Sequence, residues 1–474
     1  MQQLSCDICI IGAGPAGLTV ASASSQLGRD AILIERGKMG GDCLNYGCVP
    51  SKALIAAARH AYLLRTAGAF GISCAGPRVD FRKVMAHVRD VISSIAPDDS
   101  QDRFEKLGCR VLRSPARFVD RETVLAGEYR IKARRFVIAA GSSPYVPPIA
   151  GLAEVSYFTS DTIFDNETLP AHLLVVGAGA VGLELAQAFS RLGSQVTVLE
   201  ALRPLPGSDP ELTEIVLDAC RREHIEIIAP CRIMSARKSP EGLTLSIETS
   251  GSVRELAASH LLIAAGRRPN LEGLGLETAG IAASARGIEL TKGLKTSNPL
   301  VYAIGDVAAG DLNFTHVAAH QAGLVIKNAL FRLPVTYDPA KMPWVIYTDP
   351  EFAHAGLSEV EAKDRGLDVN VLHWPLSRTD RARIERRTDG LLKIVLDRKG
   401  RVLGAGIVGL NAGELILPWC RMIEAGEKIR RMAESVIPYP TLSEASRRVA
   451  LTKFQTLGSN AWVRRAIDVL TSIG

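Results

Sequence analysis

The sequence predicts an α/β protein that contains two copies of one strand–turn–helix–strand unit, followed by a further C-terminal region. The chain has 474 residues, which at roughly 100–200 residues per domain predicts about three domains. Its 42 glycines fit an α/β fold with many tight turns at the ends of strands. An internal repeat, formed by residues 6–35 and 172–200, accounts for the two related units.

The two copies of the repeat agree in their apolar and glycine positions. Residues 6–35 are CDICIIGAGPAGLTVASASSQLGRDAILIE, and residues 172–200 are HLLVVGAGAVGLELAQAFSRLGSQVTVLE. Each copy predicts an apolar strand, a glycine-rich turn, an amphipathic helix and a second strand that ends in glutamate. The shared positions are Gly12, Gly14, Gly17 and Glu35 in the first copy, and Gly177, Gly179, Gly182 and Glu200 in the second.

These positions carry the chemistry of a Rossmann-like dinucleotide site. The first glycine allows a tight turn, the second lets the backbone approach a pyrophosphate, and the third lets the helix pack on the strand. The helix N-terminus then faces the phosphates, and the acid hydrogen-bonds a ribose hydroxyl. Because the whole pattern occurs twice, we expect the chain to bind two dinucleotides.

Three later apolar segments complete the two units. Arg135–Gly141, His260–Arg267 and Leu300–Asp306 are predicted strands that end in small residues, where the backbone can pass close to a cofactor. Buried parallel strands without a cofactor have the same composition. The order of the three segments along the chain, relative to the two glycine turns, favours the cofactor interpretation.

Two cysteines follow the first unit in the segment GGDCLNYGCVPSK, residues 40–52. Cys43 and Cys48 lie at the predicted start of a helix and can close a short disulfide loop. The helix N-terminus and the nearby Lys52 would lower a thiol pKa. We therefore interpret this pair as redox-active. The other cysteines lack metal-ligand spacing, so we expect inert thiols and no metal site; they are Cys6, Cys9, Cys74, Cys109, Cys220, Cys231 and Cys420.

The segment GGDCLNYGCVPSK resembles the active-site segment of the class I pyridine nucleotide–disulfide oxidoreductases, which include dihydrolipoamide dehydrogenase, glutathione reductase and mercuric reductase. The resemblance covers essentially the whole chain. GAGPAG resembles the family's FAD turn, GAGAVG its NAD(P)H turn, and TSNPLVYAIGD its second FAD motif. It implies two Rossmann-like domains, for FAD and NAD(P), and an α+β dimerisation domain.

The resemblance also implies a relay and its residues. A nicotinamide hydride passes to the flavin, and the flavin reduces the Cys43–Cys48 disulfide. Cys48 is then the thiol beside the flavin, Cys43 meets the substrate, and Lys52 and Glu184 lie near the flavin and nicotinamide, although a helix-surface acid is the alternative for Glu184. The implied FAD contacts are Gly12, Gly14, Gly17, Glu35, Gly41, Lys52, Ala116, Gly141, Gly305, Asp306, His316 and Ala318. The implied NAD contacts are Gly177, Gly179, Gly182, Glu184, Glu200 and Gly266.

Two of these positions carry a further expectation. At His316 we expect the backbone at a helix N-terminus to matter more than the imidazole. At Glu200 a carboxylate accepts hydrogen bonds from a free 2′-hydroxyl and repels a 2′-phosphate, so NADH is favoured over NADPH. Arg203 is a nearby arginine of the kind that NADPH-preferring relatives carry, but it stands alone.

The C-terminal motif departs from the family. The family usually has His-Pro-Thr-x-Ser-Glu, whose histidine reaches across from the partner subunit as the acid–base group of a shared active site. Here Tyr439 occupies the histidine position, and Glu444 ends the motif. An unperturbed tyrosine has a pKa of about 10, so it is a poor base at neutral pH. We expect oxidation of a dithiol to suffer more than delivery of electrons outward.

The expected organisation is an FAD domain of residues 1–150 and 286–340, an NAD(P) domain of 151–285 and a dimerisation domain of 341–474. Within the last, we expect a hairpin over Leu391–Val408, a helix over Ala412–Ala425 and an exposed charged loop over Arg378–Arg387. Ala461–Leu470 is a basic amphipathic helix, expected to dock on the protein itself, with peripheral membrane or partner contact as the alternative.

The remaining features bound the location and partners. The net charge of +6 is expected to be a solvated surface, and no nucleic-acid-binding signature is present. With neither a signal peptide nor an apolar bilayer span in the sequence, we expect a cytoplasmic protein. It should act as a homodimer.

The leading functional hypothesis is a dihydrolipoamide dehydrogenase-like enzyme. It would exchange electrons between NAD(H) and a small dithiol or disulfide, such as the lipoyl group of a carrier protein. A mercuric reductase-like oxidoreductase acting on a metal ion, quinone or other electrophile is the first alternative, although the usual C-terminal cysteine pair is absent because Cys420 is the last cysteine. A flavin-binding scaffold subunit with weak catalysis is the second.

Overall fold

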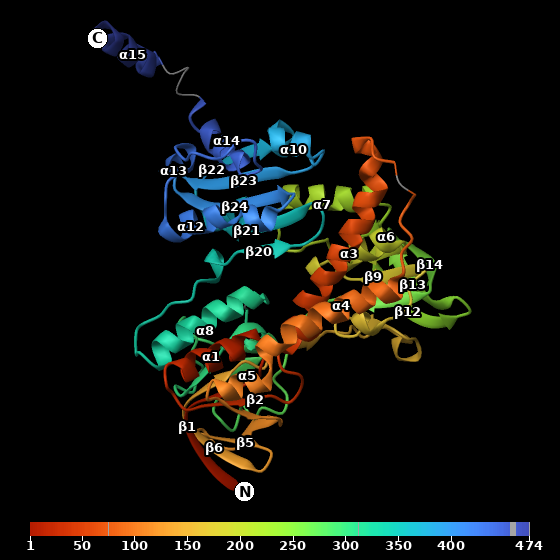
Figure 1. Ribbon diagram of the computed structural model, residues 1–474, viewed down its shortest axis with the longest axis vertical. Helices are drawn as coiled ribbons and strands as arrows, with labels where there is room; N and C mark the ends of the chain where they lie inside the picture. Colours follow the sequence, from red (N-terminus) through yellow and green to blue (C-terminus); the bar gives the residue numbers. More distant parts are fainter. Residues whose placement is uncertain (74, 311, 456–460, 474) are drawn as a thin grey trace. The chain divides into compact units, whose positions relative to one another are not determined.

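The computed structural model describes residues 1–73, 75–310, 312–455 and 461–473. The chain forms two compact units (Figure 1). Unit 1 comprises Met1–Pro204 and His224–Pro339, whereas unit 2 comprises Leu205–Glu223 and the chain from Ala340 onward. The limits expected for the separate FAD and NAD(P) domains lie inside unit 1, apart from Leu205–Glu223, and remain predictions.

The first sheet of unit 1 contains the first repeat and two later segments. Its order is β3-β2-β1-β6-β5-β4, and β19 pairs with the second half of β6. β1, β2, β3, β6 and β19 are parallel neighbours, while β4 and β5 form antiparallel pairs. The strands are β1 Gln2–Ile11, β2 Ala31–Ile34, β3 Arg110–Leu112, β4 Ala116–Phe118, β5 Thr123–Ala126, β6 Tyr129–Ile138 and β19 Val301–Ala303.

Helices cover this sheet and carry the cysteine segment. α1 (Pro15–Gln26) packs along α8 (Thr315–Ala329), and both bury small apolar residues against β1 and β2 (Figure 1). The cysteines lie on α2 (Gly41–Asn45) and at the start of α3 (Cys48–Thr66), which packs on α4 (Phe81–Ile95). α5 (Gln101–Lys106) leads into β3.

The second sheet of unit 1 repeats the same parallel arrangement, in the order β11-β10-β9-β15-β8. α6 (Ala180–Leu192) follows β9 directly, as α1 follows β1, and nearly all of it is buried. A three-stranded antiparallel sheet, β12-β13-β14, adjoins it. The strands are β8 Phe158–Thr159, β9 His172–Val176, β10 Gln195–Leu199, β11 Glu226–Ile228, β12 Arg232–Ser239, β13 Gly242–Thr249, β14 Ser252–Ala258 and β15 His260–Ile263.

Two short antiparallel pairs complete unit 1. β7 pairs with β16, and β17 pairs with β18. The first pair matters for the site because it joins the chain after β6 to the chain after β15. The bounds are β7 Ser142–Pro144, β16 Arg267–Pro269, β17 Ala283–Ser284 and β18 Gly287–Ile288.

Unit 2 is built on a five-stranded antiparallel sheet in the order β20-β21-β24-β23-β22. The expected hairpin over Leu391–Val408 is present as β23 and β24. Its core surrounds Trp419, which is fully buried. The strands are β20 Trp344–Ile346, β21 Glu351–Gly356, β22 Val369–Pro375, β23 Leu391–Asp397 and β24 Val402–Gly409.

The helices of unit 2 include one from the second repeat. α7 (Pro210–Arg222) follows β10 in the chain but packs on β21 and β24, where Leu212 meets Gly406. The helix expected over Ala412–Ala425 is broken into two, and the segment expected as an exposed loop contains α10. The bounds are α9 Glu359–Asp364, α10 Asp380–Ile384, α11 Ala412–Leu415, α12 Leu417–Ala425, α13 Arg430–Ala433 and α14 Glu444–Thr452.

The C-terminal segment forms α15 (Ala461–Ile473), longer than the predicted helix. Its apolar side chains are exposed, including Trp462, Ile467 and Leu470. Docking on the protein's own surface therefore remains a prediction. In the part of the chain that the structure describes, no helix combines the length and apolar character needed to cross a bilayer.

Candidate active site

The first glycine turn is built so that no side chain can occupy it. Gly12 has φ +108°, and a Cβ there would lie 2.2 Å from the Ala139 carbonyl oxygen. A Cβ on Gly17 would lie 1.9 Å from the carbonyl oxygen of Gly12 itself. These contacts leave only glycine at both positions, because a Cβ cannot approach a backbone oxygen so closely. The helix α1 therefore starts directly at the end of β1.

The second glycine turn reproduces this geometry. Gly177 also has φ +108°, and a Cβ there would lie 2.4 Å from the Ala264 carbonyl oxygen. At Gly182 a Cβ would lie 2.0 Å from the carbonyl oxygen of Gly177, whereas Gly179 faces open space. Backbone N–H groups at a helix start beside open space suit a pyrophosphate. The residues of both turns therefore fit dinucleotides.

The two acids at the ends of the second strands have equivalent bonds. Glu35 accepts hydrogen bonds from the backbone N–H of Ala13 (2.6 Å) and Gly37 (2.6 Å). Glu200 accepts from Ala178 (2.8 Å) and Leu202 (3.0 Å). In each case the carboxylate ties the glycine turn to the chain after the second strand. This places a carboxylate at the mouth of each turn, where a ribose hydroxyl would lie.

Close backbone contact holds the cysteine segment on the first turn. Gly41 has φ +59°, and a Cβ there would lie 2.6 Å from the Cα of Gly14. The Gly40 N–H donates to the Ala13 carbonyl at 2.9 Å. The predicted FAD contact at Gly41 is thus brought beside Gly14. Because Cys43 follows two residues later, the turn also fixes where the thiols begin.

Cys43 and Cys48 are thiols in the structure and interact with each other and with Thr315. The pKa of Cys48 is lowered, first because its sulfur accepts a hydrogen bond from Cys43, and then because of Thr315 and the charge of Lys52. The Thr315 hydroxyl lies 3.4 Å from the Cys48 sulfur. The same hydrogen bond, together with burial, raises the pKa of Cys43. Cys48 therefore has the greater thiolate character of the two sulfurs, and Cys43 is the donor of the hydrogen bond between them.

Lys52 and Glu184 form an ion pair between α3 and α6. Lys52 Nζ lies 2.6 Å from Glu184 Oε2, and the Glu184 side chain is buried. The position of Glu184 on the inner side of α6 argues against the alternative of a surface acid. Lys52 lies one turn along α3 from Cys48, so its charge favours the thiolate. The structure thus brings three of the predicted catalytic residues together.

Arg267, which no sequence motif marks as a site residue, donates to two polar groups in and beside the cysteine segment. Its guanidinium donates to Asp42 Oδ1 at 3.0 Å and to Ser142 Oγ at 2.7 Å. Ser142 in turn donates to Asp306 Oδ2 at 2.6 Å. Burial raises the pKa of Asp42, and the charge of Arg267 opposes that rise.

The other predicted FAD contacts are spread over unit 1. Gly305 has φ +69°, and its N–H donates to the Gln321 side chain at 2.7 Å. His316 lies in the first turn of α8 with its ring stacked on Phe314, and Ala318 is buried two residues further on. Ala116 is buried in β4. Gly141, and Gly266 among the predicted NAD contacts, have positive φ and open space beside them, which leaves their backbone accessible.

Tyr439 and Glu444, the predicted residues of unit 2, have separate partners. The Tyr439 hydroxyl donates to Asp380 Oδ2 at 3.0 Å, and this bond raises the pKa of the phenol. Glu444 instead accepts from Arg448 on the next turn of α14, with Nη2 at 2.6 Å. The Tyr439 side chain is 67% exposed in the single chain. Asp380 was not predicted, because it lies 59 residues earlier in the sequence.

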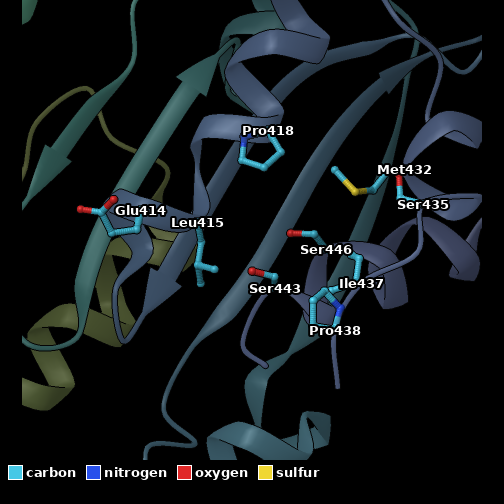
Figure 2. Close-up of a pocket in the computed structure, with 9 residues that line it drawn as sticks. All are labelled: Glu414, Leu415, Pro418, Met432, Ser435, Ile437, Pro438, Ser443 and Ser446. Carbon is cyan, nitrogen blue, oxygen red and sulfur yellow. The ribbon is translucent and has the colours of Figure 1, made fainter. Parts of the chain in front are cut away.

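A cavity of about 290 Å³ lies directly behind this segment in unit 2. Figure 2 shows Ile437, Pro438 and Ser443 lining one side of it, with Met432 and Ser435 nearby and Leu415 opposite. The segment that carries Tyr439 therefore borders this cavity, while Ile437 and Leu442 on either side of Tyr439 pack against the core of unit 2.

The remaining cysteines are placed away from these groups. Cys6, Cys9, Cys109, Cys220 and Cys231 are buried, and Cys420 is partly buried. Burial raises the pKa of Cys6 to about 12 and that of Cys109 to about 11. Cys74 lies outside the described residues. Across the described ranges, no group of three or more His, Cys, Asp or Glu side chains is arranged to hold a metal ion.

The fold and site define a flavin- and pyridine nucleotide-dependent disulfide oxidoreductase, and comparisons with known proteins agree. Residues 6–322 match the pyridine nucleotide-disulphide oxidoreductase family, and residues 342–450 match its dimerisation domain. The chain belongs to this family. The predicted family and fold class are therefore confirmed, and membership implies FAD and a pyridine nucleotide as cofactors.

Its relatives include two kinds of enzyme. A mercuric reductase of Streptomyces lividans is 35% identical over 454 residues, which cover 94% of this chain and 96% of that protein. A dihydrolipoyl dehydrogenase of Thermus scotoductus is 37% identical over 452 residues, covering 92% and 95%. A solved structure, the Cu(II) complex of the HOCl-induced flavoprotein disulfide reductase RclA from Escherichia coli, has a TM-score of 0.84 at 26% identity, covering 95% and 100%.

Proposed function

We propose that this protein is an NADH-dependent reductase of the dihydrolipoyl dehydrogenase type, which delivers electrons through FAD and the Cys43–Cys48 pair to a small disulfide such as a lipoyl group. The observation that carries the proposal is the unequal state of the two thiols. The Cys43 thiol donates a hydrogen bond to the Cys48 sulfur, and this bond, Thr315 and the charge of Lys52 all lower the pKa of Cys48. As Cys43 attacks a disulfide, its proton would pass to the Cys48 sulfur, so that Cys43 would exchange with the substrate and Cys48 would lie against the flavin.

The chain supplies a cradle for each cofactor. The first glycine turn, with Gly41 held against Gly14, would hold FAD, and the second would hold the nicotinamide coenzyme with Glu200 at its ribose. FAD, when bound, would accept a hydride from NADH and use its two electrons to reduce a disulfide. Lys52 holds positive charge beside Cys48, and the buried Glu184 fixes the direction of Lys52.

The direction of electron flow follows from Tyr439. Oxidation of a dithiol needs a group that removes a proton at neutral pH. Tyr439 keeps its own proton, because the bond to Asp380 raises the pKa of the phenol. In reduction of a disulfide, the Cys48 sulfur can take the proton of Cys43 as Cys43 attacks, so this direction depends less on Tyr439 as a base. Outward electron delivery is therefore the favoured direction.

The match to the dimerisation domain indicates a homodimer. We propose that its active site is shared, with Tyr439 acting beside the Cys43 of the partner subunit. The exposure of Tyr439, of Leu417 and especially of Val436, which is 99% exposed, supports a second copy covering this segment. We further propose a cytoplasmic location, where the disulfide would be kept reducible.

Reduction of a metal ion or another electrophile is the second candidate function. The mercuric reductase relatives favour it, as does the absence of a histidine after His373, since such a histidine would serve dithiol oxidation. An acceptor without an S–S bond would need only the reduced thiols. Lipoamide turnover separates the two candidates.

The test is turnover with lipoamide in both directions, measured at pH 7. At saturating substrates, we expect the turnover number of NADH-driven lipoamide reduction to exceed that of NAD⁺-driven dihydrolipoamide oxidation. Tyr439→His should raise dihydrolipoamide oxidation, by up to about 10²-fold if it restores a general base. The absence of lipoamide turnover in either direction would contradict the dihydrolipoyl dehydrogenase-type proposal and favour an electrophile. An unchanged or lower oxidation rate in Tyr439→His would contradict the argument on direction.

A further inference from the structure

The hydrogen bond between Tyr439 and Asp380 joins two separate segments of unit 2. Asp380 is the first residue of α10, whereas Tyr439 lies in the irregular segment before α14. Figure 1 shows α10 beside the strands β22 and β23, on which α14 packs. The bond is 3.0 Å long, and the phenol is its donor. The single proton of the Tyr439 side chain is therefore directed at Asp380.

Asp380 is held on a rigid support. The preceding residue, Thr379, is buried and accepts a hydrogen bond from the Trp374 indole at 3.0 Å. Two residues after Asp380, Ala382 is fully buried in the core of unit 2. The Arg383 side chain donates back to the Ser377 carbonyl at 2.6 Å. A carboxylate fixed in this way can define the direction of an exposed side chain.

The other acid near Tyr439 is engaged elsewhere. Glu444 Oε1 accepts from both Nε (2.8 Å) and Nη2 (2.6 Å) of Arg448. The charged groups that act on the phenol are thus Asp380 from α10 and Glu444 and Arg448 from α14, and among them Asp380 has the largest effect. Sequence position alone would have paired Tyr439 with Glu444, which lies in the same motif.

We propose that Asp380, and not Glu444, is the positioning residue of Tyr439. The carboxylate of Asp380 accepts the hydrogen bond of the phenol. Tyr439 therefore stays neutral and presents its oxygen lone pairs away from α10. The consequence of this arrangement for turnover rests on the proposed function. The group that meets Tyr439 during turnover would be a hydrogen-bond donor, such as the S–H of a thiol product. A substrate with no donor would gain nothing from this arrangement.

The direct test measures the ionisation of Tyr439 and needs no substrate. Phenolate absorbance of the FAD-loaded enzyme is titrated from neutral to alkaline pH, and the curve of Tyr439→Phe is subtracted, which isolates Tyr439 from the other tyrosines. Asp380→Asn should move the Tyr439 transition to lower pH, because the charge that stabilises the phenol is lost. Glu444→Gln, the matched control, should move it less. An unmoved transition in Asp380→Asn, or a larger movement in Glu444→Gln, would overturn the proposal.

A double-mutant cycle then tests whether Asp380 acts through Tyr439. In NADH-driven lipoamide reduction, Asp380→Asn should lower turnover about tenfold in the otherwise unchanged enzyme. The same change should have no further effect in the Tyr439→Phe background. Equal losses in both backgrounds would overturn the proposal, since Asp380 would then act independently of Tyr439. If the enzyme does not turn over lipoamide at all, the proposed function fails, and the titration alone decides the role of Asp380.

Discussion

Lys52 and Glu184 connect the thiols of unit 1 to its second nucleotide-binding unit. Nζ of Lys52, on the helix that begins at Cys48, lies 2.6 Å from the buried Oε2 of Glu184, on the helix that begins at the second glycine turn. One ion pair thus links the helix of the two thiols to the helix that follows the second glycine turn. In the proposed function, where this second helix would face the nicotinamide coenzyme, the two side chains would couple the charge beside Cys48 to the coenzyme site.

This coupling predicts opposite effects for changes at the two residues. Lys52→Met should raise the pKa of Cys48, because the stabilising positive charge is lost. Glu184→Gln should lower the pKa of Cys48 or leave it in place, because it removes a carboxylate from beside Lys52. The measurement is the pH dependence of the long-wavelength thiolate–flavin absorbance in enzyme reduced by two electrons, with each variant compared with the unchanged protein. Movement of both variants in the same direction would contradict the electrostatic account.

Arg267 is predicted to stabilise the segment in front of Cys43. It donates to Asp42 and to the side chain and carbonyl of Ser142. Arg267→Met should lower the free energy of unfolding by about 2 kcal/mol, because charged hydrogen bonds in a partly buried site are lost. The exposed neighbour Arg268 is the matched control, and Arg268→Met should cost less than about 1 kcal/mol. Urea unfolding of the FAD-loaded proteins measures both, and equal losses would show that the Arg267 contacts do not hold the segment.

Lys393 is predicted to anchor α7 in unit 2. Its ammonium lies within 2.9 Å of Asp209, at the start of α7, and within 2.8 Å of Glu359. Lys393→Met should destabilise unit 2 by about 3 kcal/mol, because it leaves the buried carboxylate of Asp209, beside that of Glu359, without its cation. Lys399→Met, on the exposed turn after β23, should cost less than about 0.5 kcal/mol. Both are measured by chemical denaturation at pH 7.

The same cluster predicts a dependence on acid. Hydrogen bonds from Lys363 and Lys393 lower the pKa of Glu359 to about 2. A carboxyl group with a depressed folded-state pKa stabilises the fold above its ordinary pKa and loses that contribution as the pH falls through the folded value. Stability should therefore decline from about pH 4.5 to about pH 2. The decline in stability should be shallower in Lys393→Met, although Lys363 still lowers the pKa of Glu359 in part. An equally steep decline would show that Lys393 does not contribute to the acid dependence.

Glu200 is predicted to select NADH. Its carboxylate, held by the N–H groups of Ala178 and Leu202, would accept from a ribose 2′-hydroxyl and repel a 2′-phosphate. The kcat/KM for NADH should exceed that for NADPH by at least about tenfold, and Glu200→Gln should narrow the ratio. Glu35 has the equivalent position in the first unit, so Glu35→Gln should weaken retention of FAD and leave the coenzyme ratio of the FAD-loaded fraction unchanged. A preference for NADPH in the unchanged enzyme would contradict this assignment.

Much of the fold could be predicted because its signals are local. The two glycine turns and their acids are defined within about thirty residues each, and the positive φ of Gly12 and Gly177 explains why glycine recurs there. The hairpin of β23 and β24 is likewise a local pattern. By contrast, α7 follows the second repeat in sequence but packs on the sheet of unit 2. Its amphipathic period marks a buried face without indicating which sheet it covers.

The contacts of the site likewise divide into those within one sequence segment, which could be predicted, and those between distant segments, which could not. Cys43, Cys48 and Lys52 lie in one segment, and the resemblance to a family supplied their partner Glu184. Arg267 and Asp42 are 225 residues apart, so neither residue marks the other in a single sequence. Tyr439 was recognised as a departure from the family motif, but its acceptor Asp380 lies in a segment expected to be a loop. Partners of this kind are set by tertiary packing, which residue spacing does not encode.

The redox centre at Cys43 and Cys48 is tested most directly by an anaerobic titration of the FAD-loaded protein, first with NADH and separately with dihydrolipoamide, followed by visible absorbance. We expect a long-wavelength thiolate–flavin band with NADH, which should be absent in Cys48→Ser. With dihydrolipoamide the same band should appear more slowly or more weakly. No band with NADH would contradict a redox centre at Cys43 and Cys48. A band with NADH but none with dihydrolipoamide would retain that centre and exclude a lipoyl substrate.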